Sequence, residues 1–242
     1  MKMRRIALGF ELSCTLALAA CGSGLTVGNS NSSQIQYVCN NGSGATLPTT
    51  TTTLPNGSLI TPYVNQSDIP GLGNTFVTNV ATEQAANLTS GVTGIHYGHD
   101  FLTSTDHIPF QAVIDGTFYI CPASQTQLPS GGTSGNWAVP VFLLHGSWLF
   151  LYNQEIFSTS TSDVTIQKSY EVAQNGQSVH QGDLLFYLHR GGPGSHVHFD
   201  IQPDTIQTTQ AVCPTQYFTA SAFSAILTLS MSSGFGSTLC YQ

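Results

Sequence analysis

Short apolar or alternating runs, broken by turn residues, constrain the fold of this chain more than any other feature. Gly, Pro and Asn separate these runs, which cover residues 110–114, 117–120, 139–144, 148–152, 184–188 and 196–201. Several short strands with regular turn signals predict an antiparallel β-sheet domain. Helical periodicity is weak except around residues 82–88 and 220–229. We therefore expect one mainly β domain with few short helices.

The charge of the chain excludes one large class of function. Only 7% of the 242 residues are charged, whereas about 25% is typical of soluble domains. Three of the five basic residues, Lys2, Arg4 and Arg5, stand at the N-terminus, so the rest of the chain is strongly acidic. Nucleic-acid binding needs a basic surface, so no nucleic-acid partner is expected.

The N-terminus is typical of an export signal. Basic residues precede an apolar block at residues 12–20, which predicts a signal peptide over residues 1–20. Residues 18–22 (LAACG) resemble a bacterial lipobox, whose cysteine is acylated and becomes the new N-terminus. We expect an exported lipoprotein, facing the periplasm or the cell surface and anchored to the membrane by a lipid at Cys21. An ordinary signal peptide with an incidental cysteine is the alternative.

Composition divides the exported chain into three parts. Residues 21–60 are rich in Ser, Thr, Asn and Gly, which predicts a flexible tether. Residues 61–204 hold the predicted strands, and residues 205–242 form a C-terminal extension. Four cysteines remain after export, which in an oxidising compartment predicts two disulfides. These are Cys39, Cys121, Cys213 and Cys240. The pairing of Cys213 with Cys240 is favoured because they bracket one segment.

Two histidine-rich clusters, at residues 94–101 and 195–201, carry the candidate chemistry. On a strand, residues i, i+2 and i+4 project from one face, so His96 lies on one side with Asp100, and His196 with His198. A catalytic zinc takes three His, Asp or Glu ligands and leaves a fourth position for water. A lone His-x-His pair is more often structural, but the two clusters together favour a metal. The spacing leaves open which of His196 and His198 is the ligand.

The motifs in their order resemble the lysostaphin-type zinc endopeptidases (peptidase M23 class), which cut peptide cross-links in bacterial cell walls. The resemblance runs from His96 to Ile201. It rests on His-x-Gly-x-Asp at residues 96–100, Asp-Gly-Thr at 115–117, Val-x-x-Gly-Asp at 179–183 and a glycine loop leading into His-Val-His-Phe-Asp at 196–200.

This resemblance implies a fold of that family, zinc bound by His96, Asp100 and His198, and His196 as the catalytic residue beside the reacting water. It also implies a peptidoglycan peptide as substrate. One departure concerns a second catalytic histidine, which the family carries in a Tyr-x-His segment. Its counterpart in this chain is Tyr152-Asn153-Gln154. His145, His180 or His189 could fill that place.

Three other readings compete with an active peptidase. One is a catalytically degenerate relative that binds cell wall or regulates another hydrolase. Another is a metalloprotein of the cupin kind, which would need Gly and Glu where this chain has Arg190, Ile201 and Gln202. A disulfide-bonded adhesin is the third. The sequence leaves the oligomeric state open.

Overall fold

The structure is a computed structural model that describes most of the predicted domain. It describes Cys39 and residues 52–63, 68–69, 71–73, 98–127, 133–203 and 214–232. Several predictions lie outside these residues. They concern the signal peptide, Cys21, the helix at residues 82–88, His96, Cys213 and Cys240.

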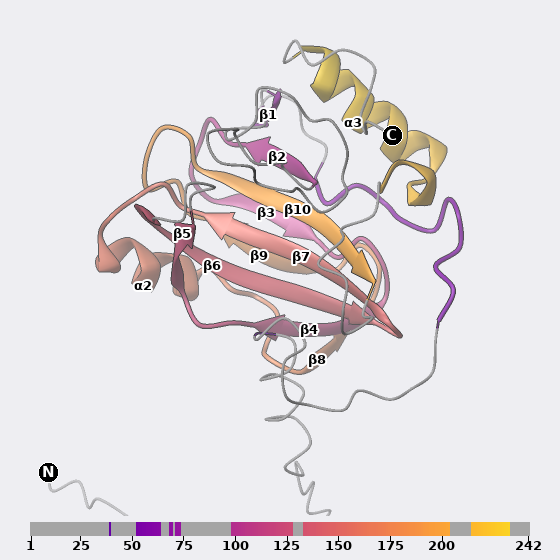
Figure 1. Cartoon of the computed structure of the whole chain (residues 1–242), viewed down its shortest axis with the longest axis horizontal. Helices are drawn as coiled ribbons and strands as arrows, with labels where there is room; N and C mark the ends of the chain where they lie inside the picture. The colour runs from indigo at the N-terminus through magenta and orange to yellow at the C-terminus, as the bar shows by residue number, and fades with distance from the viewer. Residues whose placement is uncertain are drawn as a thin grey trace, which may run out of the picture.

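The main architectural unit is an eight-stranded sheet in which neighbouring strands run antiparallel (Figure 1). Its order is β1-β2-β10-β7-β6-β4-β8, and β5 pairs with β6. A second, two-stranded antiparallel sheet joins β3 to β9. The predicted mainly β, single-domain fold class is confirmed. The strands are β1 (Gly71–Gly73), β2 (His99–Leu102), β3 (Ile108–Gln111), β4 (Gly116–Ile120), β5 (Ser124–Gln127), β6 (Thr133–His145), β7 (Trp148–Glu155), β8 (Gln177–Val179), β9 (Leu184–Leu188) and β10 (His196–Pro203).

Aromatic side chains fill the space between the two sheets. The rings of Phe110 on β3 and Phe186 on β9 stack with centroids 5.3 Å apart. Tyr152 on β7 meets Phe186 at 6.0 Å and Phe199 on β10 at 5.1 Å, both edge-on. All four side chains are fully buried. Because strand residues alternate between faces, residues 196, 198 and 200 of β10 project from the opposite face of the main sheet.

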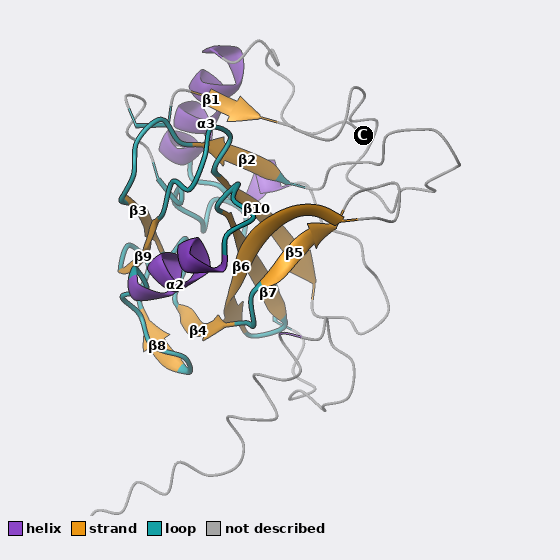
Figure 2. Cartoon of the chain, turned by 90° about the vertical axis from the view of Figure 1, so that its left-hand side faces the viewer, coloured by secondary structure: helices purple, strands orange, loops and turns teal. Residues whose placement is uncertain are grey.

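Two α-helices lie outside the sheets. The helix α3 (Ala220–Ser232) was expected from residues 220–229, and it buries Ala222, Ile226 and Leu229 along one stripe, as an amphipathic helix does. It lies beside β1 (Figure 1). The helix α2 (Thr161–Ser169) lies beside β6 (Figure 2). Its sequence has almost no apolar stripe, and the side chain of Ser160 caps its N-terminus by accepting a hydrogen bond from the Ser162 amide.

Residues 52–60 pack in the domain, although their composition assigned them to the tether. Leu54 and Leu59 are buried in the main core. The Leu59 amide donates to the Tyr217 carbonyl at 2.8 Å, and the Thr219 amide donates to the Leu59 carbonyl at 2.8 Å. Tyr217 ends the 3₁₀-helix η1 (Pro214–Tyr217). Backbone hydrogen bonds therefore join residues 52–60 to the C-terminal extension.

A disulfide joins Cys39 to Cys121, just after β4. Cys121 lies in a small buried cluster with Tyr119, Phe142 and Leu149. The expectation of disulfide bonding is confirmed for this pair. None of the described helices combines the length and the hydropathy that crossing a membrane would require.

Removing this disulfide should destabilise the domain. Replacing both Cys39 and Cys121 by Ser should lower the free energy of unfolding by about 4 kcal/mol, because the bond closes a loop with a sequence separation of 82 and thereby restricts the unfolded chain. Urea titrations of the wild type and the double variant, each with and without reductant, measure the effect. A wild type that reductant does not destabilise would contradict it.

Candidate functional site

The register of three strands brings the described site residues to one face of the main sheet. Asp100 on β2 lies opposite His198 on β10, and His198 lies opposite Asn153 on β7. His196 lies opposite Glu155 at the end of β7. Because directly opposed residues share a face, Asp100, His196, His198 and Glu155 all project away from the aromatic core. The intervening residues, such as Val197, face that core.

Asp100 and His198 are in direct contact. Nδ1 of His198 lies 2.9 Å from Oδ1 of Asp100, whose side chain is fully buried. On the other side of the ring, Nε2 of His198 lies 3.6 Å from Oδ2 of Asp200. Burial lowers the pKa of His198, but the two carboxylates outweigh burial and raise it to about 10. The surroundings of this imidazole therefore favour a positive charge.

His196 is buried with one nitrogen fixed and the other directed at carboxylates. Its Nδ1 lies 2.7 Å from the carbonyl oxygen of Gly194. A carbonyl only accepts, so Nδ1 carries the hydrogen. Nε2 makes no hydrogen bond with any described residue, yet it lies 3.5 Å from Oε2 of Glu155 and 3.8 Å from Oδ1 of Asp100. A bare imidazole nitrogen facing two carboxylates is unfavourable, which makes this corner suited to a cation or to a shared proton.

Glycine allows β2 and β10 to come together at this corner. Gly98 has φ +89°, and a Cβ at this position would lie 2.1 Å from the carbonyl oxygen of Phe199. Gly194, before β10, has φ +104°. Both values favour glycine. Glycine at position 98 lets the chain enter β2 directly against β10, which sets Asp100 against His198.

Gln154, the residue matched to the second family histidine, lies on the wrong face for that role. It is opposite Val197 and is fully buried on the core side. Glu155 is the residue that faces His196 instead, and only 5% of its surface is exposed. Its Oε1 accepts a hydrogen bond of 2.9 Å from Nδ2 of Asn153. The sequence reasoning missed Glu155, because the register between β7 and β10 decides which residue meets His196.

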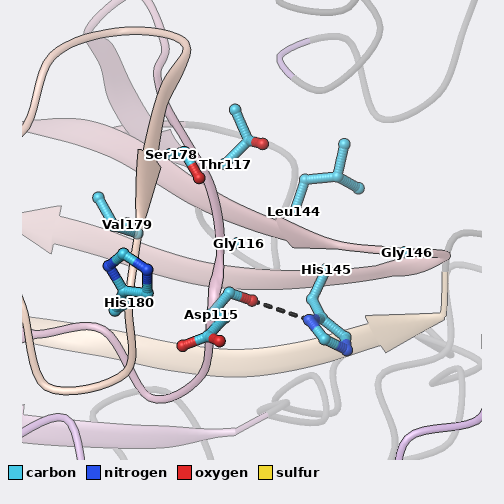
Figure 3. Close-up of a pocket in the computed structure, with 9 residues that line it drawn as sticks. All are labelled: Asp115, Gly116, Thr117, Leu144, His145, Gly146, Ser178, Val179 and His180. Carbon is cyan, nitrogen blue, oxygen red and sulfur yellow. Dashed lines mark hydrogen bonds between the residues drawn. The ribbon is translucent and has the colours of Figure 1, made fainter.

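The three histidines considered as replacements occupy other places. His145 and His180 line a pocket of about 330 Å³ between β4, β8 and the β6–β7 turn (Figure 3). There Nδ1 of His145 donates to the carbonyl oxygen of Asp115 at 2.8 Å. This turn is at the far end of β7 from Glu155, about 23 Å away at ~3.3 Å per residue. The pocket is therefore separate from the His196 corner, where the buried unpaired nitrogen lies.

His189 joins two loops to the start of α2. Its Nδ1 lies 3.0 Å from Oδ1 of Asp106, and its Nε2 lies 3.1 Å from Oδ1 of Asp163. Hydrogen bonds from Ser158 and His189 lower the pKa of the Asp163 carboxyl. These contacts occupy both ring nitrogens in a structural role.

The described residues include two of the three predicted zinc ligands. His96, the third predicted ligand, lies outside them, and within them no group of three His, Cys, Asp or Glu side chains is arranged to hold a metal ion. Asp100 and His198, the other two predicted ligands, are brought together, with His196 beside them. No protein-family model matches the chain, and no curated protein matches it.

Near Gln154 lies the buried carboxyl of Glu171. This carboxyl makes the stability of the domain depend on pH. Burial raises the pKa of Glu171 to about 7, although the Gln154 and Gln167 amides oppose this shift. Neither carboxyl oxygen of Glu171 makes a well-formed hydrogen bond, so burial dominates the shift.

Glu171 should make the domain less stable as the pH rises. Between pH 4.5, its ordinary pKa, and about 7, the folded state holds a proton that the unfolded state has lost. The free energy of unfolding should therefore fall across this range by on the order of 3 kcal/mol. The variant Glu171→Gln should lack this component. Unfolding titrations at pH 4.5, 6 and 8 test it, and a constant stability difference between wild type and variant would disprove it.

Proposed function

We propose that this protein is a zinc-dependent endopeptidase that cleaves the peptide cross-links of bacterial peptidoglycan. His96, Asp100 and His198 are its proposed ligands, and His196 is the catalytic neighbour. The single observation that carries the proposal is the contact of 2.9 Å between Asp100 Oδ1 and His198 Nδ1, next to the unpaired Nε2 of His196. The choice of substrate and the role of His96 rest on the resemblance of the motifs.

The donor atoms present fit zinc. Carboxylate oxygens and imidazole nitrogens bind this ion at ~2.0–2.2 Å, so two donors about 3 Å apart can share one ion. Asp200 lies beside the second nitrogen of His198, as the outer carboxylate of a metal-bound histidine commonly does.

Zinc and the residues around it would have separate roles in hydrolysis. When bound, zinc would lower the pKa of a water molecule and polarise the scissile carbonyl. The Gly194 carbonyl holds the imidazole of His196 in one tautomer and directs Nε2 into the site. From there Nε2 can accept a hydrogen bond from the water or, when protonated, donate one to the oxyanion that develops. Positioned groups of this kind contribute ~10²–10⁴ in rate.

A non-catalytic relative that binds cell wall is the second candidate. One observation favours it: the counterpart of the family's second catalytic histidine is Gln154, which is buried on the core side. The membrane anchor at Cys21 and the export of the chain belong to both candidates. Either would place the domain beside peptidoglycan.

Separate variants should distinguish metal binding from catalysis. Asp100→Asn and His198→Ala should each lose zinc, whereas His196→Ala should keep it and lose ~10²–10⁴ of the turnover rate. Zinc per chain is measured by elemental analysis, and turnover by mass spectrometry of peptides released from cross-linked peptidoglycan. His180→Ala is the matched control, because this side chain is 83% exposed and lies in the remote pocket.

A wild type that binds no zinc would contradict the proposed function. Stoichiometric zinc without turnover would favour the cell-wall-binding relative.

A further inference from the structure

We infer that Glu155 is a second catalytic residue of this site and the acceptor of the proton from the attacking water. The inference rests on the proposed function, because it concerns the same hydrolysis. Glu155 ends β7 directly opposite His196, and its Oε2 lies 3.5 Å from His196 Nε2.

A hydrogen bond from Asn153 orients the carboxylate of Glu155. Nδ2 of Asn153, two residues earlier on the same face, donates to Oε1 at 2.9 Å, and this directs Oε2 toward His196. Only 7% of the Glu155 side chain is exposed.

His196 and Glu155 present two proton acceptors to one small volume. The hydrogen of the neutral His196 imidazole is committed to Gly194 through Nδ1, so Nε2 offers a lone pair. Oε2 of Glu155 offers another from the opposite strand. A water molecule that reaches this volume can donate one hydrogen to each group. The two residues then fix the direction of the oxygen lone pair that attacks the substrate.

The proton transfers balance over the reaction. As the water oxygen bonds to the carbonyl carbon, one O–H bond breaks, its proton passes to Glu155 Oε2, and the C=O π pair moves to the carbonyl oxygen. When that pair re-forms the carbonyl, the C–N bond breaks, and its electrons stay on nitrogen. The leaving nitrogen takes the proton from Glu155. One water and one peptide bond give one carboxylic acid and one amine, and Glu155 returns to its starting state.

The alternative role for Glu155 is that of a metal ligand, and the variants separate the two. In the zinc-loaded full chain, Glu155→Gln keeps the shape and removes the proton acceptor. It should lower kcat by ~10²–10⁴ and leave KM and zinc affinity within about threefold of the wild type. Zinc affinity is measured by competition with a chromophoric chelator, with Asp100→Asn as the reference for a lost ligand. The matched control is Gln154→Met, a change of similar volume on the core face, which should keep kcat.

A second variant keeps the test decisive if Glu155→Gln folds poorly. Glu155→His restores a group that accepts a proton near neutral pH, and its kcat should lie within about tenfold of the wild type. Circular dichroism and zinc content confirm that each variant is folded and loaded.

The outcomes that overturn the inference are distinct from those that overturn the proposed function. An active wild type beside a Glu155→Gln variant with unchanged kcat overturns the inference alone. A loss of zinc in Glu155→Gln as large as in Asp100→Asn makes Glu155 a ligand and also overturns it. A folded, zinc-loaded Glu155→His variant that is as inactive as Glu155→Gln also overturns the inference. A zinc-loaded wild type without turnover overturns both proposals.

Discussion

The contact between Asp100 and His198 depends on the pairing of β2 with β10, and the rest of the site follows from that pairing. These strands are antiparallel, and Asp100 stands directly opposite His198. A slip of β10 by one residue would turn His198 toward the aromatic core, because strand residues alternate between faces. The core prevents the slip, since Val197 and Phe199 are fully buried on the other face. Hydrophobic packing therefore fixes the positions of these polar side chains.

The same alternation gives the two faces of β10 different side chains and different neighbours. One face contributes Phe199 to the ring cluster with Tyr152, and the other carries His196, His198 and Asp200. The strand β7 repeats the division, because Tyr152 and Gln154 face the core while Asn153 and Glu155 face the site. The candidate site thus lies on one face of two paired strands, and the glycine loop before β10 supplies the carbonyl that orients His196.

The strand pattern of the sequence predicted much of the fold, and the site only in part. The runs around residues 139–144 and 148–152 became β6 and β7, and residues 220–229 became part of α3, because alternating apolar residues directly report a half-buried element. Several elements were missed, among them the short strands β1, β5 and β8 and the helix α2. The helix α2 depends on its cap and on few buried side chains, and residues 52–60 hide two core leucines in a Thr-rich tract. The sequence could not show which residue of β10 Gln154 faces, because the register between β7 and β10 is set by tertiary packing.

The central claim is that a divalent cation binds between Asp100 and His198, and anomalous diffraction at the zinc edge tests it most directly. Crystals of the exported chain grown with zinc should show one strong peak ~2.0–2.2 Å from both an Asp100 carboxylate oxygen and His198 Nδ1, with the side chain of His96 as the third ligand. A peak at His145 and His180 instead, or no peak within bonding distance of Asp100, would contradict the account.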